Sequence, residues 1–293
     1  MRMLLIDASV YIFRAFHALP SSIKGHDGRA LNALHGYGDC LLQLLADDAA
    51  RRSAVACFDE SLTSSFRNAL YSDYKATREA PPEALVAQIQ ACRDLSRALG
   101  VATVSSPVYE ADDLIGTLMQ GHEGPVTIAS SDKDLAQLLR DGHEDTLWDF
   151  GRDVRYDRSA IQDKFGVRCE QIPDYLALVG DTVDNIPGVP GIGAKRAATL
   201  LARWASLDAL LDDLEGLANA DLRGAKGLAD RLAASREQAL LSKRLATIVT
   251  DIDLSSPARV VERGPVDDQA LADLCERVGA GRGLRKKLGV VTV

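Results

Sequence analysis

The sequence predicts an α/β protein with a mostly parallel central sheet and flanking helices, followed by an all-helical part. Short apolar runs alternate with longer helical patterns over residues 1–157, which is typical of a parallel sheet covered by helices. From residue 158 onward the patterns are almost entirely helical. The chain has 293 residues, 46% of them hydrophobic, which is enough for one large domain or two medium ones.

The expected strands of the first part are short, apolar and bounded by turn residues. They lie at residues 3–7, 54–58, 101–104 and 125–129, with a final pair at 145–150 and 154–156. Between them the apolar residues recur at helical spacing, as Leu85, Cys92 and Leu95 do. The helices of this part are expected at 8–19, 30–45, 82–99 and from about residue 109.

The second part is expected to be a series of helices. They are predicted at 159–165, 172–179, 194–204, 207–211, 227–241 and 268–278. Residues 255–265 are polar and expected to be extended, and the basic stretch 282–287 is typical of a solvated end.

Three of the expected strands end at or next to an aspartate, namely Asp7, Asp59 and Asp132. One such case means little, because aspartate often starts turns. In a parallel α/β sheet, however, ligands bind at the carboxyl ends of the strands. Three acids at strand ends therefore indicate a shared site at one sheet edge.

The stretch 108–139 carries five acids that flank one expected strand. Glu110 and Asp113 are three residues apart and share a helix face, with Asp112 between them, and Asp132 and Asp134 follow the strand. So many like charges would raise one another's proton affinity, and a hard cation such as Mg²⁺ or Mn²⁺ resolves that conflict. The alternative is ordinary helix capping by acids, but two clusters around one strand favour the metal site.

Residues 60–84 differ from the elements around them. They contain Arg67, Tyr74, Lys75 and Arg78 but little continuous apolar face, so the segment is expected to leave the sheet. Mixed basic and aromatic residues suit contact with a nucleic-acid backbone and stacking on bases. An ordinary solvated loop is the alternative, and this segment alone favours it.

Glycine and proline are dense over residues 180–193, which marks a tight connection between two helices. The glycines allow backbone N–H groups to approach an anion such as phosphate. Lys195 and Arg196 lie in the first helical turn, where the helix dipole disfavours cations unless an anion is present. A plain helix hairpin explains the glycines but not the combination of Asp181, Asp184 and Lys195.

The five cysteines lie far apart and form no CxxC pair, so neither a zinc site nor a disulfide framework is expected. They suit a reducing compartment. The apolar run at the start is too short for a signal peptide, and no stretch approaches the length of a membrane helix. We therefore expect a soluble, cytoplasmic, monomeric protein without a membrane partner.

Seven motifs together resemble one family. They are Leu5-Ile-Asp7, Phe13-Arg-Ala-Phe-His17, Phe58-Asp59, Asp73-Tyr-Lys75, Glu110-Ala-Asp-Asp113, Ser131-Asp-Lys-Asp134 and Gly180-Asp-Thr-Val-Asp-Asn-Ile-Pro-Gly-Val-Pro-Gly-Ile-Gly-Ala-Lys195. The chain resembles the 5′-nucleases of the flap endonuclease type. It is most similar to their bacterial branch, the 5′→3′ exonuclease domain of DNA polymerase I and its stand-alone relatives. The similarity runs from Leu4 to about Leu288.

The resemblance implies two domains. A PIN/resolvase-like nuclease domain would cover 1–157, with a helical arch at about 60–84 through which a 5′ single strand passes. A helical DNA-binding domain would cover 158–293. It would contain a helix-hairpin-type (H3TH) motif at about 172–204 and a C-terminal segment that returns to the core.

The resemblance also implies a centre of two or more Mg²⁺ or Mn²⁺ ions held by nine carboxylates. One group is Asp7, Asp59, Glu110, Asp112 and Asp113, and the other is Asp132, Asp134, Asp181 and Asp184. All nine positions hold a carboxylate. With these nine set aside, 33 of the 42 acidic residues remain against 34 Lys plus Arg, so the net charge of −8 does not exclude a nucleic-acid partner. A K⁺ ion held by backbone carbonyls of the H3TH motif is implied as well.

By the same resemblance, the catalytic residues are Lys75, Arg78, Asp112 and Asp113. DNA contacts are implied for Arg14, Arg67, Tyr74, Lys75, Arg78, Gly191, Gly193, Lys195 and Arg196. Two positions depart from the family pattern. Arg196 stands where Thr or Ser is usual, and Ser130-Ser131 stands where relatives often have Thr-Gly or Ser-Gly.

The expected function is that of a structure-specific 5′-nuclease that hydrolyses phosphodiesters at 5′ flaps and 5′ ends of DNA. Two metal ions can straddle one phosphodiester and activate water for that reaction. A small PIN-type ribonuclease is a rival, but it would lack the helical part over 158–250. A DNA-binding module with little catalysis is a second rival, which the intact acids disfavour.

Overall fold

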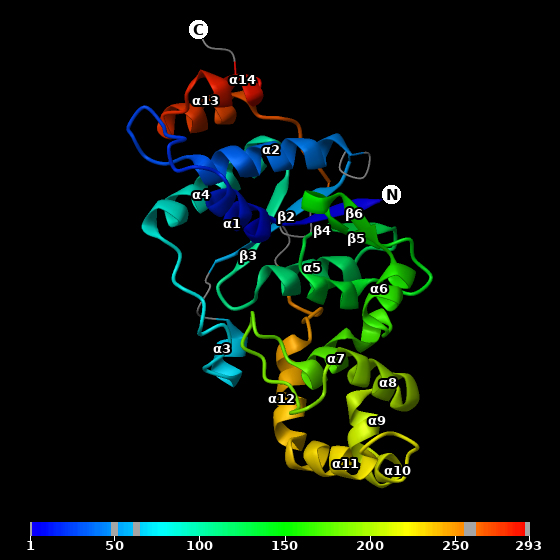
Figure 1. Cartoon of the computed structure of the whole chain (residues 1–293). Helices are drawn as coiled ribbons and strands as arrows, with labels where there is room; N and C mark the ends of the chain where they lie inside the picture. Colours follow the sequence, from blue (N-terminus) through cyan, green and yellow to red (C-terminus); the bar gives the residue numbers. More distant parts are fainter. Residues whose placement is uncertain (1, 48–51, 61–64, 255–261, 291–293) are drawn as a thin grey trace.

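The computed structural model describes residues 2–47, 52–60, 65–254 and 262–290 (Figure 1). Most of the stretch expected to be extended, 255–261, and part of the expected arch, 61–64, lie outside the described residues. In the described ranges no helix is both long and apolar enough to cross a bilayer.

The first part is built on one six-stranded sheet in the order β3-β2-β1-β4-β5-β6. Its strands are β1 (Met3–Asp7), β2 (Ala54–Asp59), β3 (Ala102–Ser106), β4 (Val126–Ala129), β5 (Thr146–Asp149) and β6 (Val154–Tyr156). All neighbours are parallel except β5 and β6. The expected strands and the mostly parallel α/β fold class are therefore confirmed.

The central strands are buried on both sides, which explains why they are continuous apolar runs in the sequence. In β1, Met3 and Leu5 belong to one hydrophobic cluster, while Leu4 and Ile6 belong to a second cluster on the opposite face. This follows from the alternation of side chains along a strand.

Helices cover both faces of the sheet. The first part holds α1 (Ala8–Ala18), α2 (Asn32–Ala46), α3 (Phe66–Leu70), α4 (Glu83–Ala98), α5 (Ala111–Gln120), η2 (Lys133–Leu138) and η3 (Phe150–Arg152). Buried residues of α1, α2 and α4 pack on one face, and those of α5 and η2 pack on the other. The described part of the expected arch forms only the short helix α3 and turns, because residues 71–82 lack an apolar stripe and end in two prolines.

The second part is helical, as expected. It contains α6 (Arg158–Phe165), η4 (Cys169–Gln171), α7 (Ile172–Val179), α8 (Ala194–Trp204), α9 (Leu207–Asp212), α10 (Leu214–Ala218), α11 (Ala225–Ala234), α12 (Arg236–Ala246), α13 (Asp268–Arg277) and α14 (Arg282–Lys287). The single helix expected at 227–241 is wrong, because the chain breaks at Ser235 into α11 and α12. No glycine or proline marks that break, and α12 instead turns to pack against α7.

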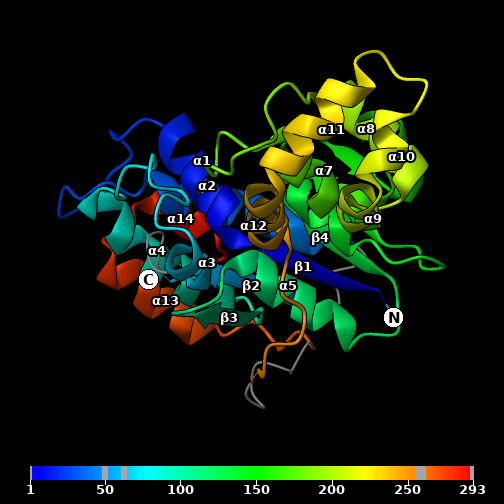
Figure 2. The same cartoon turned by 90° about the horizontal axis from the view of Figure 1, so that it is seen from below.

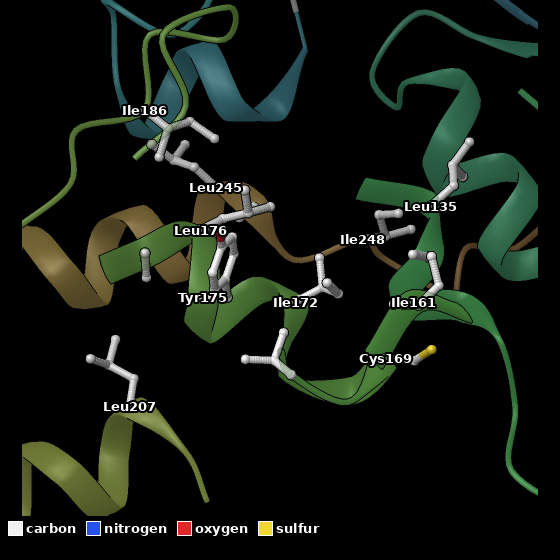
Figure 3. Packing of buried hydrophobic residues seen from close by; sticks show 14 of the residues in the cluster. Leu135, Ile161, Cys169, Ile172, Tyr175, Leu176, Ile186, Leu207, Leu245 and Ile248 are labelled. Carbon is white, nitrogen blue, oxygen red and sulfur yellow. The ribbon is translucent and has the colours of Figure 1, made fainter. Parts of the chain in front are cut away.

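The core of the helical part continues into the core of the sheet. Figure 3 shows Ile172, Tyr175 and Leu176 of α7 between Leu245 of α12 on one side and Leu135 of η2 and Ile161 of α6 on the other. These side chains belong to the same buried cluster as one face of the sheet. The two parts therefore share one core, which holds the helical part in a defined place beside the sheet edge.

The chain then returns to the first part. Leu271, Leu274 and Cys275 of α13 join the cluster that holds α1, α2 and α4, and α13 contacts α4. The stretch 282–287, expected to be a solvated end, forms α14 and buries Leu284 against the same cluster. In both views, α13 and α14 lie at the opposite end of the molecule from α8–α11 (Figures 1 and 2).

Candidate active site

The acids predicted from strand ends meet at one edge of the sheet. Asp7 ends β1, Asp59 ends β2, and Asp132 follows β4 and caps η2. Since β1 lies between β2 and β4, the connections leave this point in opposite directions along the sheet. Such a switch point is the usual ligand site of a doubly wound sheet.

Asp7 is buried at the centre of this edge. Its Oδ2 accepts a hydrogen bond from Ser130 Oγ at 2.7 Å, and its Oδ1 accepts one from Val10 N at 3.3 Å. Burial, with smaller contributions from Asp59 and Asp132, raises the pKa of Asp7 to about 7. A nearby cation would therefore strongly stabilise the ionised form of this carboxyl group.

Asp59 and Asp112 lie beside it. Asp59 Oδ1 accepts a hydrogen bond from Ala111 N at 2.8 Å, which ties the end of β2 to the start of α5. Burial raises the pKa of Asp112 well above its usual range, and Asp132 and Asp7 raise it further. The two neighbouring helix and strand ends thus present their carboxyl groups to the same place.

The acids after β4, Asp132 and Asp134, also have raised pKa values because they are buried beside other acids. Asp132 accepts a hydrogen bond from Asp134 N at 2.9 Å, and burial raises the pKa of Asp132. Burial and the neighbouring Asp132 raise the pKa of Asp134 to about 8. Asp134 Oδ1 is buried without a hydrogen-bond partner, 3.7 Å from the ammonium of Lys133. This unsatisfied oxygen is a candidate metal ligand.

Glu110 caps α5 and is surrounded by cationic and hydroxyl donors. Its Oε1 accepts a hydrogen bond from Lys75 Nζ at 2.7 Å, and its Oε2 accepts one from the Tyr74 hydroxyl at 3.0 Å. Although burial opposes it, the charges of Lys75 and Arg67 lower the pKa of Glu110. Lys75 adopts a left-handed backbone conformation with φ of 54°.

The segment before α8 adds two more acids. Asp184 accepts a hydrogen bond from Arg78 Nη2 at 2.5 Å and lies 3.7 Å from Lys75 Nζ. Asp181 is paired with Lys133, and this pairing lowers the pKa of Asp181 although burial opposes it. The acids of the second predicted group are thus brought to the same edge as those of the first.

Three residues expected to bind DNA or metal are used inside the protein instead. Arg67 is 2% exposed and Tyr74 is 3% exposed, so neither presents its side chain to DNA in this structure. Asp113 is fully buried, and both of its oxygens accept hydrogen bonds from Arg67 at 2.7 Å. The structure therefore corrects the expectation of DNA contact for Arg67 and Tyr74, and it turns Asp113 toward Arg67.

Two polar residues of the site were given no role from the sequence, although Ser130 was noted as a departure from the family pattern and Lys133 lies within a family motif. Ser130 bridges two acids, because its hydroxyl donates to Asp7 and accepts from Asp132 N at 3.0 Å. Lys133 joins η2 to Asp181. The only local signals were the position of Ser130 directly after a buried strand and the placement of Lys133 between two acids.

The glycine-rich turn forms a separate surface at the start of α8. Gly188 packs so tightly that an added Cβ would lie 2.5 Å from the carbonyl carbon of Val179. Lys195 and Arg196 are exposed, and Arg196 Nη1 donates to the Gly191 carbonyl at 2.7 Å. These residues border a hollow of about 530 Å³ that also includes Gly193 and Arg223.

Arg14 lies on the exposed side of α1. Its Nη2 donates to the Gly151 carbonyl at 3.3 Å, and an added Cβ on Gly151 would lie 1.3 Å from Arg14 Nη1. The absence of a side chain at Gly151 therefore leaves room for the guanidinium.

The acids suit a hard divalent ion by their chemistry, because every candidate ligand is a carboxylate oxygen. In the described ranges no three His, Cys, Asp or Glu side chains already form a cage around one point. Mg²⁺ commonly uses one or two carboxylates together with waters and substrate phosphates, so a preformed cage is not required. The raised pKa values and the unpartnered Asp134 oxygen fit such an ion.

Two family models together cover most of the chain. One, described as 5′-3′ exonuclease, N-terminal resolvase-like domain, matches residues 2–166. The other, described as 5′-3′ exonuclease, C-terminal SAM fold, matches residues 167–269.

Named relatives fall into two kinds. The DNA polymerase I of Pseudomonas aeruginosa is 41% identical over 93% of this chain and 30% of its own length. A 5′-3′ exonuclease of Buchnera aphidicola is 31% identical over 86% of this chain and 87% of its own length. The chain thus spans less than a third of the polymerase relative and most of the exonuclease relative.

Two solved structures of bacteriophage T5 protein share the fold. One, described as 5′-exonuclease with bound divalent metal ions (zinc), has a TM-score of 0.69 at 22% identity and covers 99% of both chains. The other, described as a flap endonuclease complex with DNA and metal ions, has a TM-score of 0.68 at 21% identity, over 99% of this chain and 97% of its own.

Proposed function

The chain belongs to the 5′-3′ exonuclease family, and from that premise we propose that it hydrolyses phosphodiesters at 5′ ends and 5′ flaps of DNA. Members of this family are nucleases, and the match extends over both halves of the chain. The T5 relative that shares its fold is described in complex with DNA and metal ions. We further propose that the protein acts as a cytoplasmic monomer.

One observation carries this proposal. Four carboxyl groups at the switch point of the sheet, those of Asp7, Asp112, Asp132 and Asp134, have raised pKa values because they are buried together. In a purely structural acid cluster, paired cations would keep the pKa values low, whereas here Lys75 and Lys133 offset only part of the rise. That arrangement favours binding of divalent cations and of the phosphate that they neutralise.

We propose Mg²⁺ or Mn²⁺ as the ions. When bound, such ions supply a hydroxide nucleophile near neutral pH and offset charge on the leaving oxygen. Asp7, Asp59, Glu110 and Asp112 would hold the first ion, and Asp132, Asp134, Asp181 and Asp184 would hold the second. We assign K⁺ to the carbonyls of the glycine-rich turn.

Lys75 and Arg78 are proposed to act on the scissile phosphate. Both cations now pair with site acids, Lys75 with Glu110 and Arg78 with Asp184. Arg78 is 37% exposed, so its guanidinium can reach a phosphate that enters between the acids and the solvent. Cations placed this way stabilise charge that develops in the transition state.

The duplex is proposed to lie across the start of α8. Lys195 and Arg196 are exposed there, and the first N–H groups of a helix bind anions well. Arg14 lies on α1, the helix that begins directly after Asp7, and would contact a phosphate closer to the scissile bond.

Cleavage of an end-labelled 5′-flap duplex tests the proposal. We expect Mg²⁺-dependent release of the flap, no release with chelator, and no comparable cleavage of a matched RNA hairpin. Asp112→Ala should abolish cleavage while DNA binding in Ca²⁺ persists. Equal rates for the wild type and Asp112→Ala would contradict the assignment, and faster cleavage of the RNA would favour the ribonuclease alternative.

A further inference from the structure

Arg67 makes an unusually complete set of hydrogen bonds. Its Nε donates to the Leu245 carbonyl at 2.8 Å. Its Nη1 donates to Glu110 Oε2 at 3.0 Å and to Asp113 Oδ2 at 2.7 Å. Its Nη2 donates to Asp113 Oδ1 at 2.7 Å and to the Thr247 carbonyl at 3.0 Å. A guanidinium has five N–H donors, so none is left for another partner.

Asp113 is equally saturated. Besides Arg67, its Oδ1 accepts a hydrogen bond from Val249 N at 2.9 Å, and its Oδ2 accepts one from Glu110 N at 3.1 Å. With four hydrogen bonds on two oxygens and no exposure, Asp113 would have to lose several contacts before it could bind an ion. This is a different environment from that of Asp7 and Asp134.

The pair of Arg67 and Asp113 joins three segments that are distant in the sequence. Arg67 lies in α3, which leads directly to Lys75, and Asp113 lies in the first turn of α5. The two carbonyls come from the end of α12, where a cation is also favoured by the helix dipole. One guanidinium therefore connects α3 in the expected arch, α5 beside the sheet, and the end of α12 in the helical part.

We propose that Arg67 is a positioning residue of the active site and that Asp113 acts through Arg67 rather than as a metal ligand. This inference rests on the proposed function, because it concerns the same site. Arg67 fixes the Glu110 oxygen that it shares with Tyr74, and this leaves the other oxygen facing Lys75. Through α3 it also fixes the turn that carries Lys75.

Arg67 would act as a hydrogen-bond partner of the proposed metal ligand Glu110, so its loss should have the effect known for such partners. Loss of such a partner typically costs about 10- to 100-fold in metal affinity or activity. We therefore expect Arg67→Met and Asp113→Asn each to lower the single-turnover cleavage rate by about that factor. DNA affinity in Ca²⁺ should change little, because Arg67 does not reach the surface.

A double-substitution cycle separates positioning from metal binding. If both residues act as one unit, Arg67→Met with Asp113→Asn should be no slower than the worse single variant, since coupled residues are not additive. The double variant also removes both buried charges together, which is tolerated better than removal of one. It should therefore regain melting temperature relative to the single variants without regaining rate.

Arg140 provides a matched control. It is also an arginine that pairs with an aspartate, at 2.8 Å from Asp145, and its side chain is 20% exposed; it donates to three backbone carbonyls but lies outside the site. Arg140→Met should lower the melting temperature and leave the single-turnover rate of the folded protein unchanged. A loss of rate in Arg67→Met that merely matched its loss of stability would make Arg67 a structural residue only.

A second measurement does not depend on cleavage. The rise in melting temperature on titration with MnCl₂ should need about 10- to 100-fold more Mn²⁺ in Arg67→Met than in the wild type. A wild-type Mn²⁺ response in Arg67→Met, or multiplicative rate losses in the double variant, would overturn the inference. Absence of cleavage by the wild type and by Arg140→Met alike would instead overturn the proposed function, and the Mn²⁺ titration would still decide the role of Arg67.

Discussion

Replacing Lys75 with alanine should reduce the rate of DNA cleavage far more than the affinity for DNA. The Lys75 ammonium lies 2.7 Å from Glu110 and 3.7 Å from Asp184, and its side chain is only 13% exposed. Removal of a group that stabilises transition-state charge costs on the order of 100-fold or more in rate. DNA affinity arises from many phosphate contacts, so the loss of one lysine should change it only modestly.

The same substitution should also lower stability. Removing one partner of a buried ion pair costs about 3–5 kcal/mol. We expect a cost near the lower end, because Glu110 keeps Arg67 at 3.0 Å and Asp184 keeps Arg78 at 2.5 Å. Lys75 has φ of 54°, a conformation that is as unfavourable for alanine as for lysine, so backbone strain should not change.

Single-turnover cleavage with enzyme in excess separates these effects, because binding is then saturated. The assay should be run well below the melting temperature of the variant. Lys164→Ala is the control, since Lys164 is an exposed cation that lies 4.1 Å from the Tyr156 ring. If Lys75→Ala cleaved at the wild-type rate and only its dissociation constant rose, Lys75 would be a binding contact and the catalytic role would be refuted.

Three further predictions concern the acids and the proposed DNA contacts. In EDTA, the free energy of unfolding should fall as the pH rises from about 4 to 8. In the folded protein the pKa values of Asp7 and Asp134 are raised to about 7 and about 8, so these groups stay protonated at pH values at which the same aspartates in the unfolded chain, with a pKa of 3.8, have lost their protons. Melting temperatures at pH 5 and 8 check this, and a more stable protein at pH 8 without metal would contradict it. Ser130→Ala removes a hydrogen bond that stabilises ionised Asp7, so the pKa of Asp7 should rise. The acid limb of the pH–rate profile, measured at subsaturating Mg²⁺, should therefore move to higher pH, and an unchanged acid limb would contradict this role of Ser130. Lys195→Ala should weaken duplex binding and lower the slope of log affinity against log salt by about 1, as measured by fluorescence anisotropy in Ca²⁺, and an unchanged slope would exclude a phosphate contact.

Much of the fold could be predicted from the sequence because its signals are local. The buried strands are continuous apolar runs, and most expected helices begin and end within two residues of the observed ones. The break at Ser235 could not be predicted, because no glycine or proline is present and the packing of α12 on α7 decides it.

The sequence by itself determined which acids follow the strands, and the parallel order of β2, β1 and β4 then brings Asp7, Asp59 and Asp132 to one edge. The sequence could not distinguish acids that face the site from acids that form ion pairs inside the protein. Asp112 and Asp113 are adjacent in the sequence, yet burial among other acids raises the pKa of Asp112, whereas Asp113 pairs with Arg67.

Only the tertiary structure decided the role of Arg67. In the sequence it stands among basic and aromatic residues that suit DNA contact. Its acceptors on Asp113 and Leu245 lie 46 and 178 positions further along the chain, so no local pattern could reveal them. The shared core of the sheet and the helical part brings these acceptors together, and they satisfy the donors that a buried guanidinium must not leave unpaired, so Arg67 can lie inside the protein rather than at the surface.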